Sequence, residues 1–205
     1  MLLNHRPYKL FITGMSGYGK TIYWSNFVLG WRGAAKFIFD FDGQFAFRHR
    51  IRAARTPPEI EAAAARGFCV FDPATMFPGE RMAGFAFFCE YASAMSAGRE
   101  GRKLFACDEL QQCVGDERTC QELQEVLENG RIKGLDFAAI TIAPNLVHNR
   151  IRGQATEVVT FRQGTAEALP WLALRGFDKD AVMALPRGHY IARGESGGET
   201  RGRVF

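Results

Sequence analysis

Short, uninterrupted apolar runs alternate with longer, helix-like segments along most of the chain. Such runs are typical of strands that are buried on both faces of a sheet. We expect strands at 9–13, 35–41, 67–71, 103–107, 137–142, 158–161 and 189–192, and helices at 22–29, 59–66, 81–98, 118–129, 166–174 and 179–184. The alternation predicts an α/β fold, with a doubly wound, mainly parallel central sheet flanked by helices.

The ends of several elements carry local signals. We expect a loop at 111–116, and the helix that follows it should stop at Asn129-Gly130, since Asn and Gly are common at helix C-termini. The strand at 189–192 is expected at a sheet edge, and residues from about 194 to 205 should form a loose Gly/Arg/Glu-rich tail. A chain of 205 residues can bury a substantial core, and we expect a single domain over 1–205.

Composition narrows the picture only slightly. The chain has 26 Lys and Arg against 22 Asp and Glu, a mild basic excess that permits a polyanionic partner without requiring one. The five cysteines include no C-x-x-C pair, so we expect reduced thiols rather than a zinc site. No stretch resembles a signal peptide, and the apolar runs fall far short of the ~20 residues of a membrane span.

The first strand runs into a glycine-rich loop that matches G-x-x-x-x-G-K-[ST], the phosphate-binding P-loop. The candidate nucleotide-binding residues are Gly14, Met15, Ser16, Gly17, Tyr18, Gly19, Lys20 and Thr21. The glycines allow backbone N–H groups to point at phosphate oxygens, and the following helix adds its N-terminal partial charge. Lys20 would reach the β- and γ-phosphates, and Thr21 would ligate Mg²⁺. The motif predicts a site for a nucleoside triphosphate such as ATP.

A second apolar strand, at 103–107, ends in Asp108-Glu109. Asp108 would hold the Mg²⁺ assembly, and Glu109 would act as the general base that polarises the attacking water. Alternatively, both acids cap the next helix. Together with the P-loop, the pair indicates hydrolysis rather than binding alone.

Charged residues also follow the strand at 35–41. Asp40 and Asp42 fit the loop-bearing edge of a parallel sheet, where ligands bind. Four arginines come next in the sequence: Arg48, Arg50, Arg52 and Arg55. They form either a phosphate-contacting patch or, as we favour from the sequence, a solvated flank.

The order of these blocks resembles the FtsK/HerA superfamily of DNA-pumping ATPases. The similar parts are the P-loop, the strand that runs into Asp40-Phe41-Asp42-Gly43, the Asp108-Glu109 strand, a Gly130-Arg131-x-x-Gly134 turn, a sensor-like strand that ends in Thr141-Ile142-Ala143-Pro144, and a short strand that ends in Phe161-Arg162. A compact chain of this kind is most similar to the genome-packaging ATPases of tailless icosahedral viruses with an internal membrane.

The resemblance implies a RecA/FtsK-like sheet and a homo-oligomeric ring, a hexamer or pentamer, with ATP and Mg²⁺ at subunit interfaces and double-stranded DNA in the channel. It implies that Arg131 is an arginine finger, although a cation near a helix C-terminus is also favoured by the helix dipole. The sequence departs from the family at Ile142, where a sensor Gln is usual. Thr141 and Asn145 are the nearby polar side chains that could replace it.

The function implied is an ATP-hydrolysing DNA translocase that packages a viral genome into a preformed capsid. It would act in the host cytoplasm and at the packaging vertex of the virion, with capsid vertex or portal proteins as partners. Three alternatives stay open: a filamentous-phage-type morphogenesis ATPase, which usually carries a hydrophobic span, a small-molecule P-loop kinase, and a nucleotide-gated structural subunit.

Overall fold

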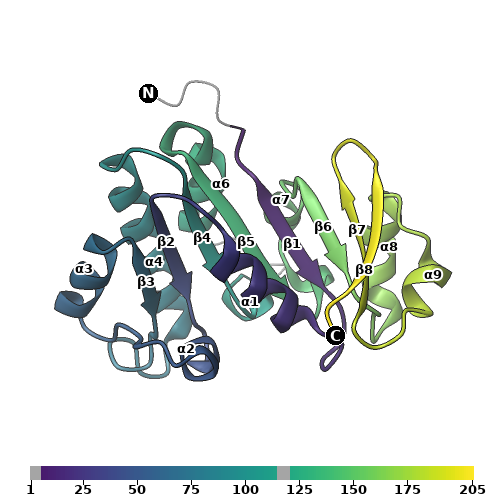
Figure 1. Cartoon of the computed structure of the whole chain (residues 1–205), viewed down its shortest axis with the longest axis horizontal. Coiled ribbons are helices and arrows are strands. Elements are labelled where there is room, and N and C mark those ends of the chain that lie inside the picture. Colours follow the sequence, from purple (N-terminus) through teal and green to yellow (C-terminus); the bar gives the residue numbers. More distant parts are fainter. Residues whose placement is uncertain (1–5, 115–120) are drawn as a thin grey trace. The chain divides into compact units, whose positions relative to one another are not determined.

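The computed structural model describes residues 6–114 and 121–205. Within these residues an eight-stranded, mixed and mainly parallel sheet is flanked by helices, which confirms the predicted fold class (Figure 1). The strands are β1 (Lys9–Thr13), β2 (Ala35–Phe39), β3 (Phe68–Phe71), β4 (Lys103–Cys107), β5 (Leu135–Thr141), β6 (Glu157–Thr160), β7 (His189–Gly194) and β8 (Glu199–Arg203). The helices are α1 (Lys20–Gly30), α2 (Gln44–His49), α3 (Pro57–Ala65), α4 (Arg81–Ala97), α5 (Leu110–Cys113), α6 (Gln121–Lys133), α7 (Asn149–Arg152), α8 (Leu169–Leu174) and α9 (Lys179–Met183), with short 3-10 turns η1 (Pro144–Leu146) and η2 (Ala166–Ala168).

The chain divides into two compact units, and each is described by itself. The first holds residues 6–7, 30–108 and 121–137. In it β2 pairs in parallel with β3 and with β4, α3 packs on β3, and α4 packs on α6. Phenylalanines fill its core: the rings of Phe39 and Phe85 lie 5.0 Å apart, and those of Phe71 and Phe88 are stacked at 5.0 Å. The heavy use of Phe in the sequence therefore serves packing.

The second unit holds residues 8–29, 109–114 and 138–205. Its strands run β1-β6-β7-β8, with β1 and β6 parallel and the other two pairings antiparallel. Trp24 of α1 is fully buried, and its indole N–H donates to the Ala138 carbonyl at 3.1 Å. This bond and the burial of Trp24 fix the helix that follows the P-loop.

The predicted end of one helix is wrong. The helix predicted to stop at Asn129-Gly130 continues as α6 to Lys133, and Gly134 ends it with a φ of 63°. Gly130 is required for close packing instead, because a Cβ there would lie 2.7 Å from the Leu135 carbonyl oxygen. The predicted start of this helix at Arg118, and Cys120, lie outside the described residues.

The predicted loose tail is also wrong over residues 199–203. They form β8, which pairs with β7 from His189–Arg203 to Arg193–Glu199, so β7 is not the edge strand. There are also smaller differences: β2 stops at Phe39, the unpredicted helix α2 follows it, and α5 overlaps the start of the loop predicted at 111–116. No helix among the described residues is long and apolar enough to cross a bilayer.

Candidate nucleotide-binding site

The P-loop joins β1 to α1 in the second unit. Its three glycines, Gly14, Gly17 and Gly19, have φ values of 142°, 79° and 111°, which L-residues with side chains rarely adopt. The Met15 N–H donates to the Arg162 carbonyl at 2.7 Å, which ties the loop to the second residue after β6. The loop therefore has the backbone that the motif predicts, and α1 begins directly at Lys20.

Lys20 is the buried cation of this loop. Its side chain is only 6 % exposed, and Nζ donates to the Met15 carbonyl at 2.9 Å. Burial lowers the pKa of Lys20 from 10.5 to about 8, and the negative charge of Glu109 partly opposes that shift. A desolvated ammonium inside a glycine-rich loop is suited to a polyphosphate, because phosphate oxygens would restore the favourable environment of its charge. The residues present thus fit a bound nucleoside triphosphate.

Glu109 begins α5 in the left-handed region, with φ 46° and ψ 44°. This conformation is strained for a residue with a side chain, and such strain gathers at functional sites. Its carboxylate makes no capping hydrogen bond to α5, so the helix-cap alternative does not account for Glu109. The backbone strain and the charge interaction with Lys20 make Glu109 a candidate acid of the nucleotide site.

Gln111 was not predicted as a site residue. Its Nε2 donates to Glu109 Oε2, and its Oε1 accepts a hydrogen bond of 3.3 Å from the backbone N–H of Ile142. The amide side chain therefore links Glu109 to the end of β5, where the sequence lacks the usual sensor Gln. Thr141, the other candidate, is buried and its Oγ1 accepts from the Ala143 N–H at 3.2 Å.

The loop is also held by the chain that precedes β7. Arg187 Nε donates to the Gly17 carbonyl at 2.9 Å, and the Gly188 N–H donates to the Tyr18 carbonyl at 3.1 Å. A Cβ at Gly19 would lie 2.7 Å from Cγ2 of Val204, so the C-terminal hairpin packs directly against the loop. Sequence analysis did not predict these contacts, because the residues that make them are far apart in the sequence.

Asp108 and Arg131, the remaining predicted site residues, belong to the first unit. Asp108 is 7 % exposed, and its Oδ1 accepts from the Phe41 N–H at 2.9 Å. Arg131 lies exposed in the last turn of α6. Among the residues that the structure describes, no group of three or more His, Cys, Asp or Glu is arranged to hold a metal ion.

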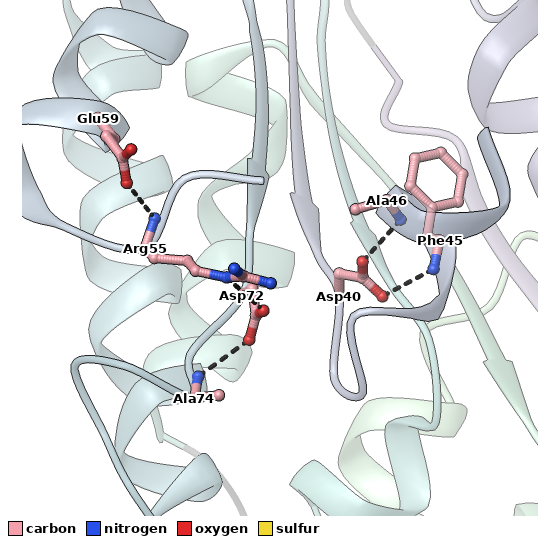
Figure 2. Close-up of polar contacts among 7 residues, drawn as sticks. All are labelled: Asp40, Phe45, Ala46, Arg55, Glu59, Asp72 and Ala74. Carbon is pink, nitrogen blue, oxygen red and sulfur yellow. Dashed lines mark hydrogen bonds and ion pairs between the residues drawn. The ribbon is translucent and has the colours of Figure 1, made fainter. Parts of the chain in front are cut away.

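The carboxylates after β2 have structural partners. Asp40 is fully buried and accepts from the N–H groups of Phe45 and Ala46 at 3.0 and 2.8 Å, so it anchors the start of α2 (Figure 2). Burial raises the pKa of Asp40, and these two hydrogen bonds oppose the shift. Asp42 pairs with Arg81 at 2.5 Å.

The sequence matches no protein-family model and no curated protein. Solved structures do match. The genome-packaging NTPase B204 of Sulfolobus turreted icosahedral virus 2, in complex with ATPγS, is 14 % identical, with a TM-score of 0.73 over 97 % of this chain and 98 % of B204. B204 of Sulfolobus turreted icosahedral virus, a DNA-packaging ATPase, gives 0.68 at 14 % identity, over 97 % of this chain and 98 % of that one.

Larger proteins contain the same fold. EccC of Thermomonospora curvata (ATPases 2 and 3) is 12 % identical with a TM-score of 0.58, and 96 % of this chain matches 36 % of that structure. The pCW3 conjugation coupling protein TcpA gives 0.60 at 12 % identity, with 97 % of this chain matching 60 % of it. At these identities the likeness establishes the fold alone. The chain therefore has the P-loop ATPase fold of the viral genome-packaging NTPase B204, shared with FtsK/HerA-type ATPases such as EccC and TcpA.

Proposed function

We propose that this chain is an ATP-hydrolysing motor that moves double-stranded DNA into a preformed viral capsid. The observation that carries the proposal is the glycine-rich loop with its buried Lys20, whose charge interacts with the strained Glu109. The shared fold with B204 supports the packaging role, and the mild positive charge of the chain is compatible with a DNA partner.

In this proposal the P-loop backbone and Lys20 bind the triphosphate, with Lys20 contacting the β- and γ-phosphates. Thr21 and Asp108 are the residues that would hold Mg²⁺, which supplies positive charge that offsets the charge on the phosphoryl oxygens. Glu109 would take a proton from the water that attacks the γ-phosphorus, as the bond to the ADP oxygen breaks. Gln111 would hold the Glu109 carboxylate in place through its two hydrogen bonds.

The chain would work as a homo-oligomeric ring of five or six subunits. Arg131 of one subunit would contact the γ-phosphate bound to its neighbour, where a guanidinium offsets transition-state charge. Its exposed position in the last turn of α6 is compatible with contact to another subunit. The motor would act at the packaging vertex of the virion, alongside capsid vertex or portal proteins, after synthesis in the host cytoplasm.

Steady-state ATP hydrolysis with and without linear duplex DNA tests the proposal, with the mass distribution recorded in the same buffer. We expect a ring-sized species whose hydrolysis is stimulated by DNA. Glu109→Gln should bind ATP but hydrolyse it roughly 10²- to 10⁴-fold more slowly, as for the loss of a general base. Lys20→Ala should not bind ATP. DNA-independent hydrolysis by a monomer, or phosphoryl transfer to a nucleoside, would contradict the motor and favour a small-molecule enzyme.

A further inference from the structure

Helix α2 ends in an exposed patch of one aromatic and two cationic side chains. The α2 patch consists of Phe47, Arg48 and Arg50, all of them exposed, and Phe47 is 87 % exposed. Neither arginine has an acidic partner within residues 6–114 and 121–205. A Phe this exposed contributes little to the packing of the unit, and the arginines at positions 48 and 50 flank it in the sequence.

The other two arginines of the sequence cluster are neutralised by carboxylates. Arg52 pairs with Glu59 at 2.7 Å, and Arg55 Nε donates to Asp72 Oδ2 at 2.8 Å. Figure 2 shows Arg55 directed at Asp72, with its backbone N–H bound to Glu59. The structure thus separates the four arginines into a structural pair, Arg52 and Arg55, and an unpaired pair in the α2 patch.

The backbone of the α2 patch is held from both ends. At its start, the buried Asp40 carboxylate accepts from two successive N–H groups of α2, and the Phe45 side chain is buried (Figure 2). At its end, Arg50 has a left-handed φ of 54°, and the Ile51 N–H donates to the Ala46 carbonyl at 2.9 Å. Because the backbone that carries the three side chains is ordered in advance, little backbone entropy is lost when a partner binds.

We propose that the α2 patch contacts the sugar-phosphate backbone of double-stranded DNA. This inference rests on the proposed motor function, and it names the surface that meets the substrate. Guanidinium groups bind phosphate through paired N–H donors, and their positive charge is complementary to that of the backbone. Phe47 would pack its ring against the deoxyribose between the phosphates bound by Arg48 and Arg50, which would explain why this ring is exposed in the free chain.

Three variants separate this surface from general charge. Arg48→Gln/Arg50→Asn removes the unpaired charges, and Asn is chosen at position 50 because it tolerates the left-handed conformation. Arg52→Gln is the local control for the single variant Arg48→Gln, since it removes a neighbouring charge that already has a partner. Binding of a fluorescent 30-base-pair duplex is followed by anisotropy with a non-hydrolysable ATP analogue, over a range of salt concentrations.

For the double variant we expect the slope of log affinity against log salt to flatten by about two for each engaged subunit. Each phosphate contact contributes about 0.9 to this slope. With 1 M salt as the reference, the loss of one contact should therefore weaken DNA binding at 0.1 M salt roughly eightfold, and the loss of two contacts roughly 60-fold. Arg52→Gln should bind DNA like the wild type. Hydrolysis without DNA and the ring mass should be unchanged in all three variants.

Other outcomes overturn the inference in distinguishable ways. If the wild type binds DNA and Arg48→Gln and Arg52→Gln weaken it equally, the contact surface lies elsewhere and the motor function stands. If the double variant loses the ring-sized species instead, the α2 patch contacts a second copy of this chain. If the assembled wild type has no DNA affinity at low salt, the motor function fails together with this surface.

Discussion

Titration of Lys20 should make ATP binding depend on pH in a range where few side chains change charge. Burial lowers the pKa of Lys20 to about 8 in the free protein. Its ionised fraction therefore falls from about nine tenths at pH 7 to about one tenth at pH 9. Bound phosphate favours the ionised form, so the pKa of Lys20 should rise in the complex and nucleotide binding should take up a proton.

The magnitude follows from the free protein. If Lys20 stays ionised in the complex, the ATP association constant should fall about tenfold between pH 7 and pH 9, about 1.4 kcal/mol. ATP itself contributes little, because phosphate monoesters lose their second proton at about pH 6 and are already about nine tenths ionised at pH 7. Between pH 8 and 10.5 the free energy of unfolding should rise with pH, because in this window the unfolded chain binds a proton that the folded chain does not.

Isothermal titration calorimetry measures this directly. At pH 8, titrations in two buffers of different ionisation enthalpy should report uptake of about half a proton per ATP bound. Lys20→Arg is the matched control, since a guanidinium keeps its charge and should show no such dependence. An ATP affinity that is equal at pH 7 and pH 9, or an equal pH slope in the Arg variant, would refute the assignment of Lys20 as the buried phosphate-binding cation.

Further predictions concern substitutions at single residues. Gln111→Leu should lower hydrolysis while ATP affinity stays the same, because the Glu109 carboxylate loses the bond that positions it; wild-type turnover in a single-turnover assay would exclude this role. Gln111→Glu should lower hydrolysis as Gln111→Leu does, because an ionised carboxylate at position 111 has no hydrogen to donate to Glu109. Gly130→Ala should cost about 1–3 kcal/mol of stability in urea unfolding, since its Cβ meets the Leu135 carbonyl. Gly98→Ala, where that space is open, should leave stability within about 0.5 kcal/mol, and equal losses at both glycines would contradict the packing role.

The parts of the fold that follow from local pattern were predicted well. Strands such as β2 and β4 are continuous apolar runs, and their burial on both faces makes the pattern visible in the sequence. The end of α6 was predicted wrongly, because Gly130 does not end the helix. A glycine is needed there because a Cβ would lie too close to the Leu135 carbonyl oxygen of the following strand. Strand β8 was missed because Glu199–Arg203 is polar and mostly exposed, and only its pairing with β7 defines it.

In the candidate site too, the residues of a local motif were predicted, and the residues that depend on distant contacts were not. The P-loop is one contiguous motif, so the sequence alone predicts its glycines and Lys20. Arg187 could not be predicted, because its partner, the Gly17 carbonyl, is 170 residues away in the sequence. Gln111 lies near Glu109 in the sequence, yet its second partner, Ile142, comes from the end of β5. The pairing that separates Arg52 from Arg48 likewise depends on where α3 places Glu59.

Displacement of a third strand from duplex DNA tests the central claim most directly. A triplex-forming oligonucleotide bound near one end of a linear duplex reports a motor that moves along the DNA. We expect displacement that requires ATP and that is lost in Glu109→Gln, even though this variant still binds ATP and DNA. If the wild type hydrolyses ATP in a DNA-stimulated manner but leaves the third strand bound, the chain is a DNA-activated ATPase and not a translocase.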